Sequence, residues 1–323
     1  MKATRILLAV CAITGLVAAA RAQAQSYPAK SVRVVVPWPP GGTSDILARI
    51  AAEKFQQLLG QPFVVDNRPG ATGIIGSAEV AKAAPDGYTL KLANIGSDVV
   101  APVIYPKVGW DPATESTPIG MIAVVGNVLV VHPSVPARTV QEFIAHAKAN
   151  PGRIAFGSSG NGTTLHLSGI LFNEMAGTEL IHVPYKGSGP ALNDLLGGQI
   201  QSMFDNLPSA VPHIKAGKLR ALAMTGARRV DALPEVPTVG EGLPGYEVTT
   251  WFGIFGPGNM PREVVNRLNE ALRRMVELPD VKARLAQQGV DPLPLTAEEM
   301  AALYRRDQER WIPLVRRHNL RAQ

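Results

Sequence analysis

The stretch SVRVVVPWPPGGTSDILARIAAEKFQQLLG, residues 31–60, sets the architecture of the chain. Its first six residues, 31–36, are mostly valine, which is typical of a short buried strand. Proline and glycine end that strand at residues 37–42. Apolar residues then recur at helical spacing up to the last glycine of the stretch, and Ser44 or Asp45 is the expected N-cap. A strand, a glycine-rich turn and a helix begin a βαβ unit, which predicts an α/β fold.

The same alternation continues and predicts two doubly wound α/β domains with parallel sheets. Further strands are expected at residues 63–65, 88–93, 128–131, 154–156, 202–204, 219–224 and 250–255. Helices are expected between most of these strands. Two more begin at Pro261 and at the capping box of Thr296 and Glu299, the second with a kink at Pro313. Strand 250–255 should cross back and the tail should return to the first domain, which gives two crossovers and a cleft between domains.

Length and composition agree with two domains. A chain of 323 residues is near the limit of a single core, and a chain with 46% apolar and 18% charged residues must fold. We place the first domain at residues 25–124 together with 227–323, and the second at residues 125–226. The chain has no run of lysine and arginine, which argues against a nucleic-acid partner.

Residues 1–24 have the pattern of a secretory signal peptide. Two basic residues precede an apolar run that is too short to span a bilayer, and the small-x-small sequence Ala22-Gln23-Ala24 follows. Cleavage after Ala24 would place the mature protein in the bacterial periplasm and lower its formal net charge from +6 to +3. It would also remove Cys11, the only cysteine of the sequence, and so exclude disulfides and thiolate chemistry.

Four turns between a strand and a helix are rich in glycine, at residues 40–43, 70–73, 157–164 and 187–189. In open α/β sheets the carboxyl ends of strands face the ligand crevice, and helix N-termini there favour an anion. Either these turns bind an anion through N–H groups and hydroxyls, or their glycines only make tight turns. The hydroxyl-rich turn at residues 157–164 favours binding. Because the phosphate motifs Gly-Lys-Ser/Thr and Gly-x-Gly-x-x-Gly are missing, a small carboxylate fits better than a nucleotide.

Several side chains near these turns have two possible roles. Lys186 and Arg68 are either ligand contacts or solvated surface charges. Asp45 is either a helix cap or one of a carboxylate pair with Asp205, which ends an apolar strand and would suit a ligand amine or hydroxyl. Trp38 either covers a ligand or packs in the core.

Catalysis finds little support in the sequence. The motif Gly-x-Ser-x-Gly is missing, and Ser158 and Ser159 have no marked base partner. The six histidines show no metal-ligand spacing, and His166 is either a general base or a hydrogen-bonded helix residue. We therefore expect no enzyme, no catalytic residue, no metal and no cofactor.

Six blocks in order along the chain resemble the Bug family, the extracytoplasmic solute receptors of tripartite tricarboxylate transporters. The blocks are VPWPPGGTSD (36–45), VDNRPGATG (65–73), PDGYTL (85–90), GSSGNGT (157–163), HVPYKG (182–187) and LPEVPT (233–238). The resemblance implies a type II periplasmic binding-protein fold, in which two α/β domains joined by two crossover strands close around a ligand. It also implies that the first loop and the serine/threonine loop jointly hold a carboxylate. Trp38 stands where many relatives have phenylalanine, a departure that bears on pocket size.

The leading hypothesis is a periplasmic solute-binding receptor for a small organic carboxylate: a di- or tricarboxylate, an acidic amino acid or an aromatic acid. Its two lobes would close on the ligand, and the receptor, taken as a monomer, would deliver it to a tripartite tricarboxylate transporter permease. The alternatives are a periplasmic serine hydrolase or esterase and a ligand-dependent partner of a sensor protein. The predicted ligand site comprises Trp38, Pro40, Gly41, Gly42, Thr43, Asp45, Ser97, Ser158, Ser159, Gly160, Asn161, Gly162, Thr163, Thr164, Lys186 and Asp205.

Overall fold

The computed structural model describes residues 27–322, so the predicted signal peptide at residues 1–24 lies outside the described residues. The strands are β1 (Val32–Val36), β2 (Phe63–Asn67), β3 (Thr89–Asn94), β4 (Ser116–Val131), β5 (Ala155–Ser158), β6 (Ile181–Pro184), β7 (Ser202–Asn206), β8 (Arg220–Met224), β9 (Thr249–Pro257) and β10 (Asp291–Pro292). The helices are α2 (Thr43–Leu59), α3 (Ile74–Ala81), α4 (Ala101–Ile104), α5 (Val140–Ala149), α6 (Thr164–Ala176), α7 (Ser188–Leu196), α8 (Leu207–Lys215), α9 (Val239–Gly242), α10 (Arg262–Glu277), α11 (Pro279–Ala286) and α12 (Ala297–Arg317), with a 3-10 turn η1 (Ala71–Gly73) and a π-helical turn η2 (Gly96–Val100).

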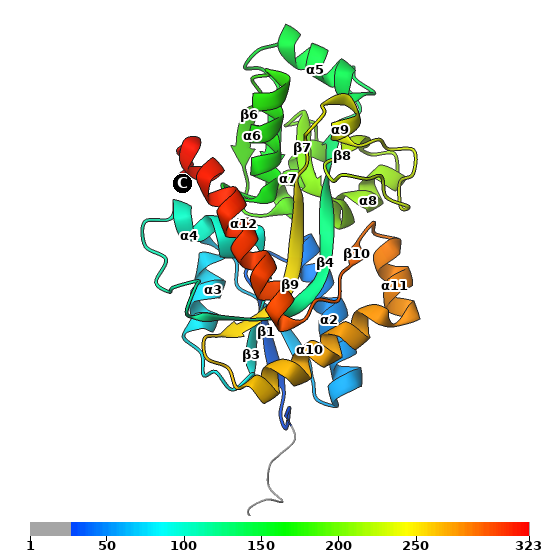
Figure 1. Cartoon of the computed structure of the whole chain (residues 1–323). Coiled ribbons are helices and arrows are strands. Elements are labelled where there is room, and N and C mark those ends of the chain that lie inside the picture. The colour runs from blue at the N-terminus through cyan, green and yellow to red at the C-terminus, as the bar shows by residue number, and fades with distance from the viewer. Residues whose placement is uncertain (1–26, 323) are drawn as a thin grey trace, which may run out of the picture.

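Each of two lobes is built on three parallel strands (Figure 1). In the first lobe the order is β2-β1-β3, followed by β9 and β4, each antiparallel to the strand before it. In the second lobe the order is β6-β5-β7, followed by β4 and β8 in the same antiparallel manner. The predicted two-lobed α/β fold is confirmed. The sheets are mixed rather than wholly parallel, because the strands that cross between the lobes run against their neighbours.

The long strand β4 belongs to both lobes. It pairs with β9 up to Gly126 and with β7 from Asn127 onward, so one continuous strand passes from one sheet to the other. Sequence reasoning recognised only residues 128–131 of it. Pro118 and Gly120 conceal the earlier part, since both are unfavourable in a strand, and the register with β9 shifts between them. Strand β9 runs beside β4 and completes the second crossing, as predicted (Figure 1).

Helix α2 packs its apolar face against the first sheet. Leu47 and Phe55 on that face are fully buried, which contributes about 1.5–3 kcal/mol for each side chain. The N-cap is Gly42, so the prediction of Ser44 or Asp45 as the cap was wrong. The helix starts two or three residues earlier than the predicted caps imply, and both polar residues lie inside its first turn.

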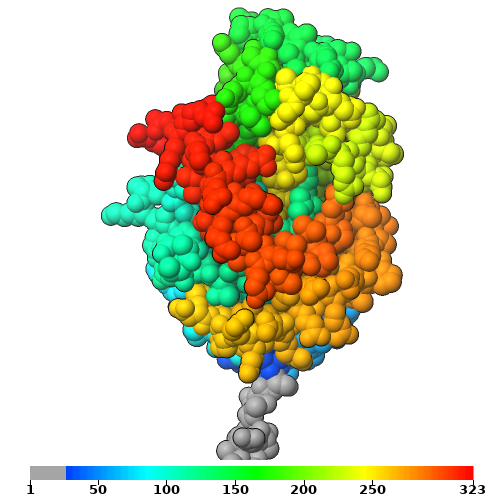
Figure 2. Space-filling model, in the orientation of Figure 1, coloured from blue at the N-terminus to red at the C-terminus, as the bar shows by residue number. Residues whose placement is uncertain are grey.

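The C-terminal tail returns to the first lobe, as predicted. Helix α12 packs Tyr304 against Phe255 of β9 and continues through Pro313. Figure 2 shows α12, in red, crossing the middle of this face from the first lobe toward the second. At its end, His318 Nε2 lies 3.1 Å from a carboxylate oxygen of Glu174 in α6, so α12 touches both lobes. Across residues 27–322, no helix has the length and apolar character that crossing a membrane requires.

Candidate functional site

A small cavity lies between the lobes, where strand ends and helix starts from both of them meet. Its volume is about 30 Å³, which suits one group the size of a carboxylate. The lining residues are Trp38, Pro39, Gly42, Thr43, Ser44, Asn94 and Gly96 from the first lobe, Ser159, Thr163, Thr164, Leu165, Gly187, Ser188 and Asn206 from the second, and Thr250 and Phe252 of β9. None of these residues, all of them in the described part of the chain, has a charged side chain.

Four helices begin at the small cavity. The N-caps of α2, α6, α7 and α8 are Gly42, Thr163, Gly187 and Asn206, and all four caps belong to the lining. The first turn of a helix has N–H groups without a partner inside the helix, and its end carries a partial positive charge. Four such ends directed at one small space favour an anion without any cationic side chain.

A larger cavity, called the side chamber below, adjoins the small cavity and shares Trp38, Pro39 and Ser159 with it. Its volume is about 600 Å³, within the usual range of small-molecule sites. Its other lining residues are Pro69, Gly70, Ala71, Thr72, Gly73, Tyr105, Gly160, Asn161, Pro184, Tyr185 and Lys186. The two lobes touch beside it, where Thr72 Oγ1 donates a hydrogen bond of 3.1 Å to the carbonyl of Asn161.

Asp45 lies behind the first loop and outside both linings. Its carboxylate accepts hydrogen bonds from Arg49 Nη2 at 2.9 Å, from Gly41 N at 3.1 Å and from Asn67 Nδ2 at 3.0 Å. Burial opposes its ionisation, but these hydrogen bonds outweigh burial and lower the pKa of Asp45. Asn67 also donates to the carbonyl of Trp38 at 3.0 Å. The Asp45 carboxylate therefore holds in place the loop that carries Trp38.

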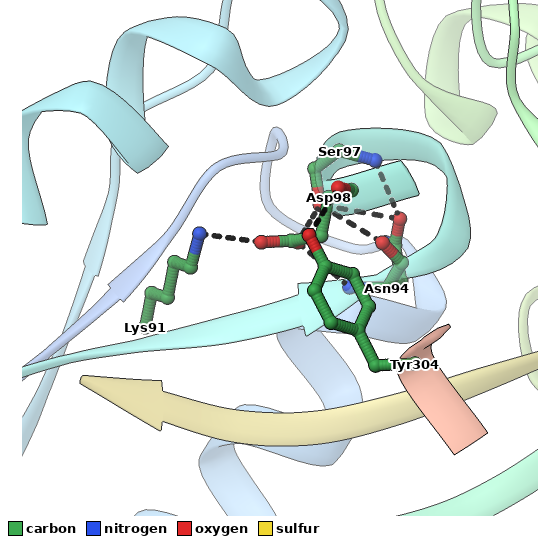
Figure 3. Close-up of polar contacts among 5 residues, drawn as sticks. All are labelled: Lys91, Asn94, Ser97, Asp98 and Tyr304. Carbon is green, nitrogen blue, oxygen red and sulfur yellow. Dashed lines mark hydrogen bonds and ion pairs between the residues drawn. The ribbon is translucent and has the colours of Figure 1, made fainter. Parts of the chain in front are cut away.

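A buried ion pair supports the β3 side of the small cavity (Figure 3). Lys91 Nζ lies 2.5 Å from Asp98 Oδ1, and both side chains are 1% exposed. The other carboxylate oxygen accepts from Asn94 N at 3.2 Å and from Ser97 Oγ at 2.6 Å. Tyr304 of α12 donates to the main-chain carbonyl of Asp98 at 2.8 Å. Asn94 lines the small cavity, whereas the predicted ligand residue Ser97 lies in this supporting network.

Ser158 has a histidine partner that sequence reasoning missed. Its Oγ lies 2.7 Å from His182 Nε2, so the expectation that Ser158 lacks a base partner is wrong. The rings of His182 and His166 are stacked with their centroids 3.7 Å apart. Burial lowers the pKa of His182 to about 4 and that of His166 to about 3. Ser158 is fully buried and lines neither cavity. His166 accepts from Gly162 N at 3.2 Å, which confirms a hydrogen-bonded helix histidine.

Asp205 lies behind the second lobe's side of the small cavity and is fully buried. Ser188 Oγ and Ser209 Oγ each donate to its carboxylate at 2.7 Å. Burial raises the pKa of Asp205 to about 6, although both hydroxyls oppose the shift. Thr43 of the first lobe donates to Ser209 at 3.4 Å. Asp205 thus fixes Ser188, which lines the cavity, and Ser209, which meets the other lobe.

The structure brings part of the predicted ligand site together. Lining one cavity or both are Trp38, Gly42, Thr43, Ser159, Gly160, Asn161, Thr163, Thr164 and Lys186. Outside both linings are Pro40, Gly41, Asp45, Ser97, Ser158, Gly162 and Asp205. Sequence reasoning missed the cavity residues Asn94 and Asn206, although each is a polar residue at the end of an apolar strand, the same signal that drew attention to Asp205. Within residues 27–322, no three His, Cys, Asp or Glu side chains are grouped as a metal site requires.

Comparison with known families identifies the group of proteins to which the sequence is similar. The family model described as "Tripartite tricarboxylate transporter family receptor", TctC, matches residues 47–320. The chain belongs to this family. TctC proteins are periplasmic solute-binding receptors, so the general class predicted from the sequence is confirmed.

Individual relatives cover nearly the whole chain. A "UPF0065 protein in tcbD-tcbE intergenic region" of Pseudomonas sp. (strain P51) is 40% identical over 321 residues, which are 98% of this chain and 95% of that protein. "Protein BugT" of Bordetella pertussis is 35% identical over 321 residues, 98% of each chain, which confirms the resemblance to the Bug family. The solved structure "R. palustris Rpa4515 with adipate" has a TM-score of 0.89 at 37% identity and covers 92% of this TctC-family chain and 100% of its own. This likeness confirms the two-lobed receptor fold.

Proposed function

We propose that this TctC-family chain is a periplasmic receptor that captures a small organic carboxylate between its lobes and delivers it to a tripartite tricarboxylate transporter permease. The observation that carries the proposal is the uncharged small cavity at four helix N-termini. Neutral donors with aligned helix ends bind a carboxylate by charge-assisted hydrogen bonds and need no cation. The relative Rpa4515 was solved with adipate, a dicarboxylate, which supports this ligand class.

Closure of the lobes is the proposed means of capture. Two hydrogen bonds join the lobes, one from Thr43 of the small cavity to Ser209 and one from Thr72 to Asn161 at the side chamber. A ligand that contacts both lobes would shift the population toward this closed arrangement, because only the closed form offers all its donors at once. In this proposal the lobes are residues 25–124 with 227–323 and residues 125–226, and the signal peptide ends at Ala24.

Native mass spectrometry of the mature protein, purified without denaturation, tests the proposal. We expect one intact organic acid per monomer, and a panel of carboxylates should raise the melting temperature of the emptied protein. Ser159→Ala should weaken binding by about tenfold through loss of one hydrogen bond, whereas the exposed control Ser134→Ala should bind as the wild type does. The absence of both a copurified acid and any stabilising carboxylate would contradict a receptor for this class.

Delivery to a permease needs its own test. Ligand-loaded receptor should drive uptake into vesicles that contain the permease subunits, and empty receptor should not. Ligand-dependent binding to a sensor protein, with no uptake in the vesicle assay, would replace transport by signalling.

The Ser158–His182 contact favours a second candidate, a serine hydrolase. The full burial of Ser158 counts against it, because a nucleophile must reach its substrate. A fluorophosphonate probe should leave Ser158 unlabelled, and Ser158→Ala should retain a bound acid. Labelling of Ser158, or ester turnover lost in Ser158→Ala, would support the hydrolase and overturn the receptor.

A further inference from the structure

The small cavity and the side chamber differ in what they offer a ligand. The small cavity holds about 30 Å³ and presents polar donors. The side chamber holds about 600 Å³ and combines three aromatic rings and three prolines with small residues and with the polar residues Thr72, Ser159, Asn161 and Lys186. A ligand with one carboxylate in the small cavity must place the rest of its body in the side chamber, because the two spaces share Trp38, Pro39 and Ser159. The chemistry of the side chamber therefore selects among carboxylates.

The aromatic residues of the side chamber have their polar atoms already engaged or hidden. Tyr185 OH donates to Asp194 Oδ2 at 2.7 Å, and the hydroxyls of Tyr105 and Thr72 share a hydrogen bond of 3.2 Å. Trp38 is only 8% exposed, and its Nε1 is buried without a hydrogen-bond partner among the described residues. Tyr105 and Tyr185 therefore offer mainly ring surface, and Trp38 contributes its ring while it keeps one unpaired N–H group. The prolines of the lining have no N–H to donate and add further flat apolar surface.

Lys186 is the one charged residue that lines the side chamber within the described residues. It is exposed, and in the part of the chain from 27 to 322 no hydrogen bond or ion pair engages its ammonium group. No acidic residue of that part lines the chamber. A second anionic group on the ligand would meet this single positive charge without repulsion.

Resting on the proposed function, we propose that this receptor selects an aromatic acid that carries a second anionic group. One carboxylate occupies the small cavity, the ring packs against Trp38, Tyr105 and Tyr185, and the second anionic group pairs with Lys186. Ring packing of this kind adds about 0.5–1.5 kcal/mol beyond the burial of apolar area. A rigid ring also loses less conformational freedom on binding than a flexible aliphatic diacid of similar length.

Isothermal titration calorimetry at pH 7 with benzoate, benzene-1,4-dicarboxylate and adipate tests the proposal on protein shown by mass spectrometry to be empty. Benzene-1,4-dicarboxylate should bind about tenfold more tightly than benzoate and about tenfold more tightly than adipate. Lys186→Met should lower the affinity for the aromatic diacid to within about threefold of that for benzoate, because an exposed ion pair contributes about 1 kcal/mol or less. The affinity for benzoate should not change. The matched control Lys218→Met, an exposed lysine of the same lobe outside both linings, should match the wild type.

Tyr185→Leu gives an independent measurement. It should lower the affinity for both aromatic acids by the same factor, because leucine lacks the ring. The affinity for adipate should change little, because leucine keeps apolar surface. Circular dichroism and the melting temperature verify that the variant is folded.

Three results would overturn the inference. In the first, adipate binds as tightly as the aromatic diacid. In the second, Lys186→Met leaves the affinity for the aromatic diacid unchanged. In the third, Tyr185→Leu lowers the affinity for adipate as much as the affinity for the aromatic acids. All three leave a carboxylate receptor in place. The failure of every carboxylate to bind would instead contradict the proposed function itself, so the two failures are distinguishable.

Discussion

The two lobes support their sides of the small cavity by different electrostatics. In the first lobe the support is a pair of charged side chains, Lys91 and Asp98, held 2.5 Å apart and almost fully buried. In the second lobe burial works against the charged forms of the supporting groups. Burial lowers the pKa of His182 to about 4 and raises that of Asp205 to about 6. The same cavity thus rests on an ion pair on one side and on groups disfavoured as ions on the other.

This difference predicts where each lobe is vulnerable. An ion pair in the interior is damaged most when one partner is removed, because the other is left as an unpaired buried charge. Groups whose pKa values shift on folding make stability depend on pH, and the direction depends on the sign of the shift. The first lobe should therefore be sensitive to loss of a partner, and the second lobe to pH.

The largest effect is expected from Lys91→Met. It leaves Asp98 buried without its partner and should lower the free energy of unfolding by about 3–5 kcal/mol. Urea unfolding at pH 7 measures the loss. The double variant Lys91→Met/Asp98→Asn should recover part of it, because no charge remains unpaired. The control Lys82→Met, at an exposed position of the same lobe, should stay within about 0.5 kcal/mol of the wild type. An equal loss of stability in Lys91→Met and Lys82→Met would contradict the role of the ion pair.

Asp205→Asn should change the slope of stability against pH. Because the folded pKa of about 6 lies above the ordinary value of 3.8, the folded state holds a proton that the unfolded chain releases, so stability falls as pH rises from about 4 to 6. Asparagine cannot ionise, and the variant should gain about 2–3 kcal/mol relative to the wild type over this range. Urea midpoints at pH 4, 5, 6 and 7 check it, with the exposed Asp231→Asn as control. Parallel pH curves for wild type and variant would exclude the shift.

His182→Phe should change the slope in the opposite direction. A folded pKa of about 4, below the ordinary value of 6.5, means that stability is lost as pH falls from about 6.5 to 4, because the unfolded chain takes up the proton first. Phenylalanine keeps the ring on His166 but cannot take up a proton, so about 2–3 kcal/mol of this acid loss should disappear. The lost bond to Ser158 should lower stability by about 1 kcal/mol at every pH. An acid loss of undiminished size would show that His182 does not contribute.

The smallest effect is expected from Asp45→Asn. Arg49 is 54% exposed, so loss of its ion pair with Asp45 should lower stability by only about 0.5–1 kcal/mol. Ligand affinity should fall by more than that stability change suggests. The reason is that the loop that carries Trp38 loses the carboxylate that accepts hydrogen bonds from Gly41 and Asn67. Titration calorimetry measures the change in ligand affinity, and urea unfolding measures the change in stability. Unchanged affinity would show that the loop holds its shape without the carboxylate.

Sequence reasoning succeeded where neighbouring residues determine structure. The valine run at residues 32–36, the glycine turn before α2 and the amphipathic pattern of α10 depend on short-range periodicity and on steric demands, and all three appear as expected. It failed at the start of β4. Pro118 and Gly120 break the sequence pattern of a strand there, and the segment is nevertheless a strand because it pairs with β9.

The candidate site divides in the same way. Among the predicted glycine and hydroxyl residues of the turns, those that line the small cavity are Gly42, Thr43, Ser159, Thr163 and Thr164. A strand end followed by a helix start is visible in one dimension, so sequence reasoning could point to them. The supporting contacts were not visible, since the partners are distant along the chain or lack any motif.

The sequence by itself determined the alternation of strands and helices, the glycine-rich turns between them and the family, because each of these is written in residues a few positions apart. Only the tertiary structure decided that four helix N-termini meet at one cavity, that Ser158 meets His182 24 residues away, and that Tyr304 reaches Asp98 across 206 residues. It also decided which pKa values shift, because a pKa shift arises from burial and from partners that only packing brings together.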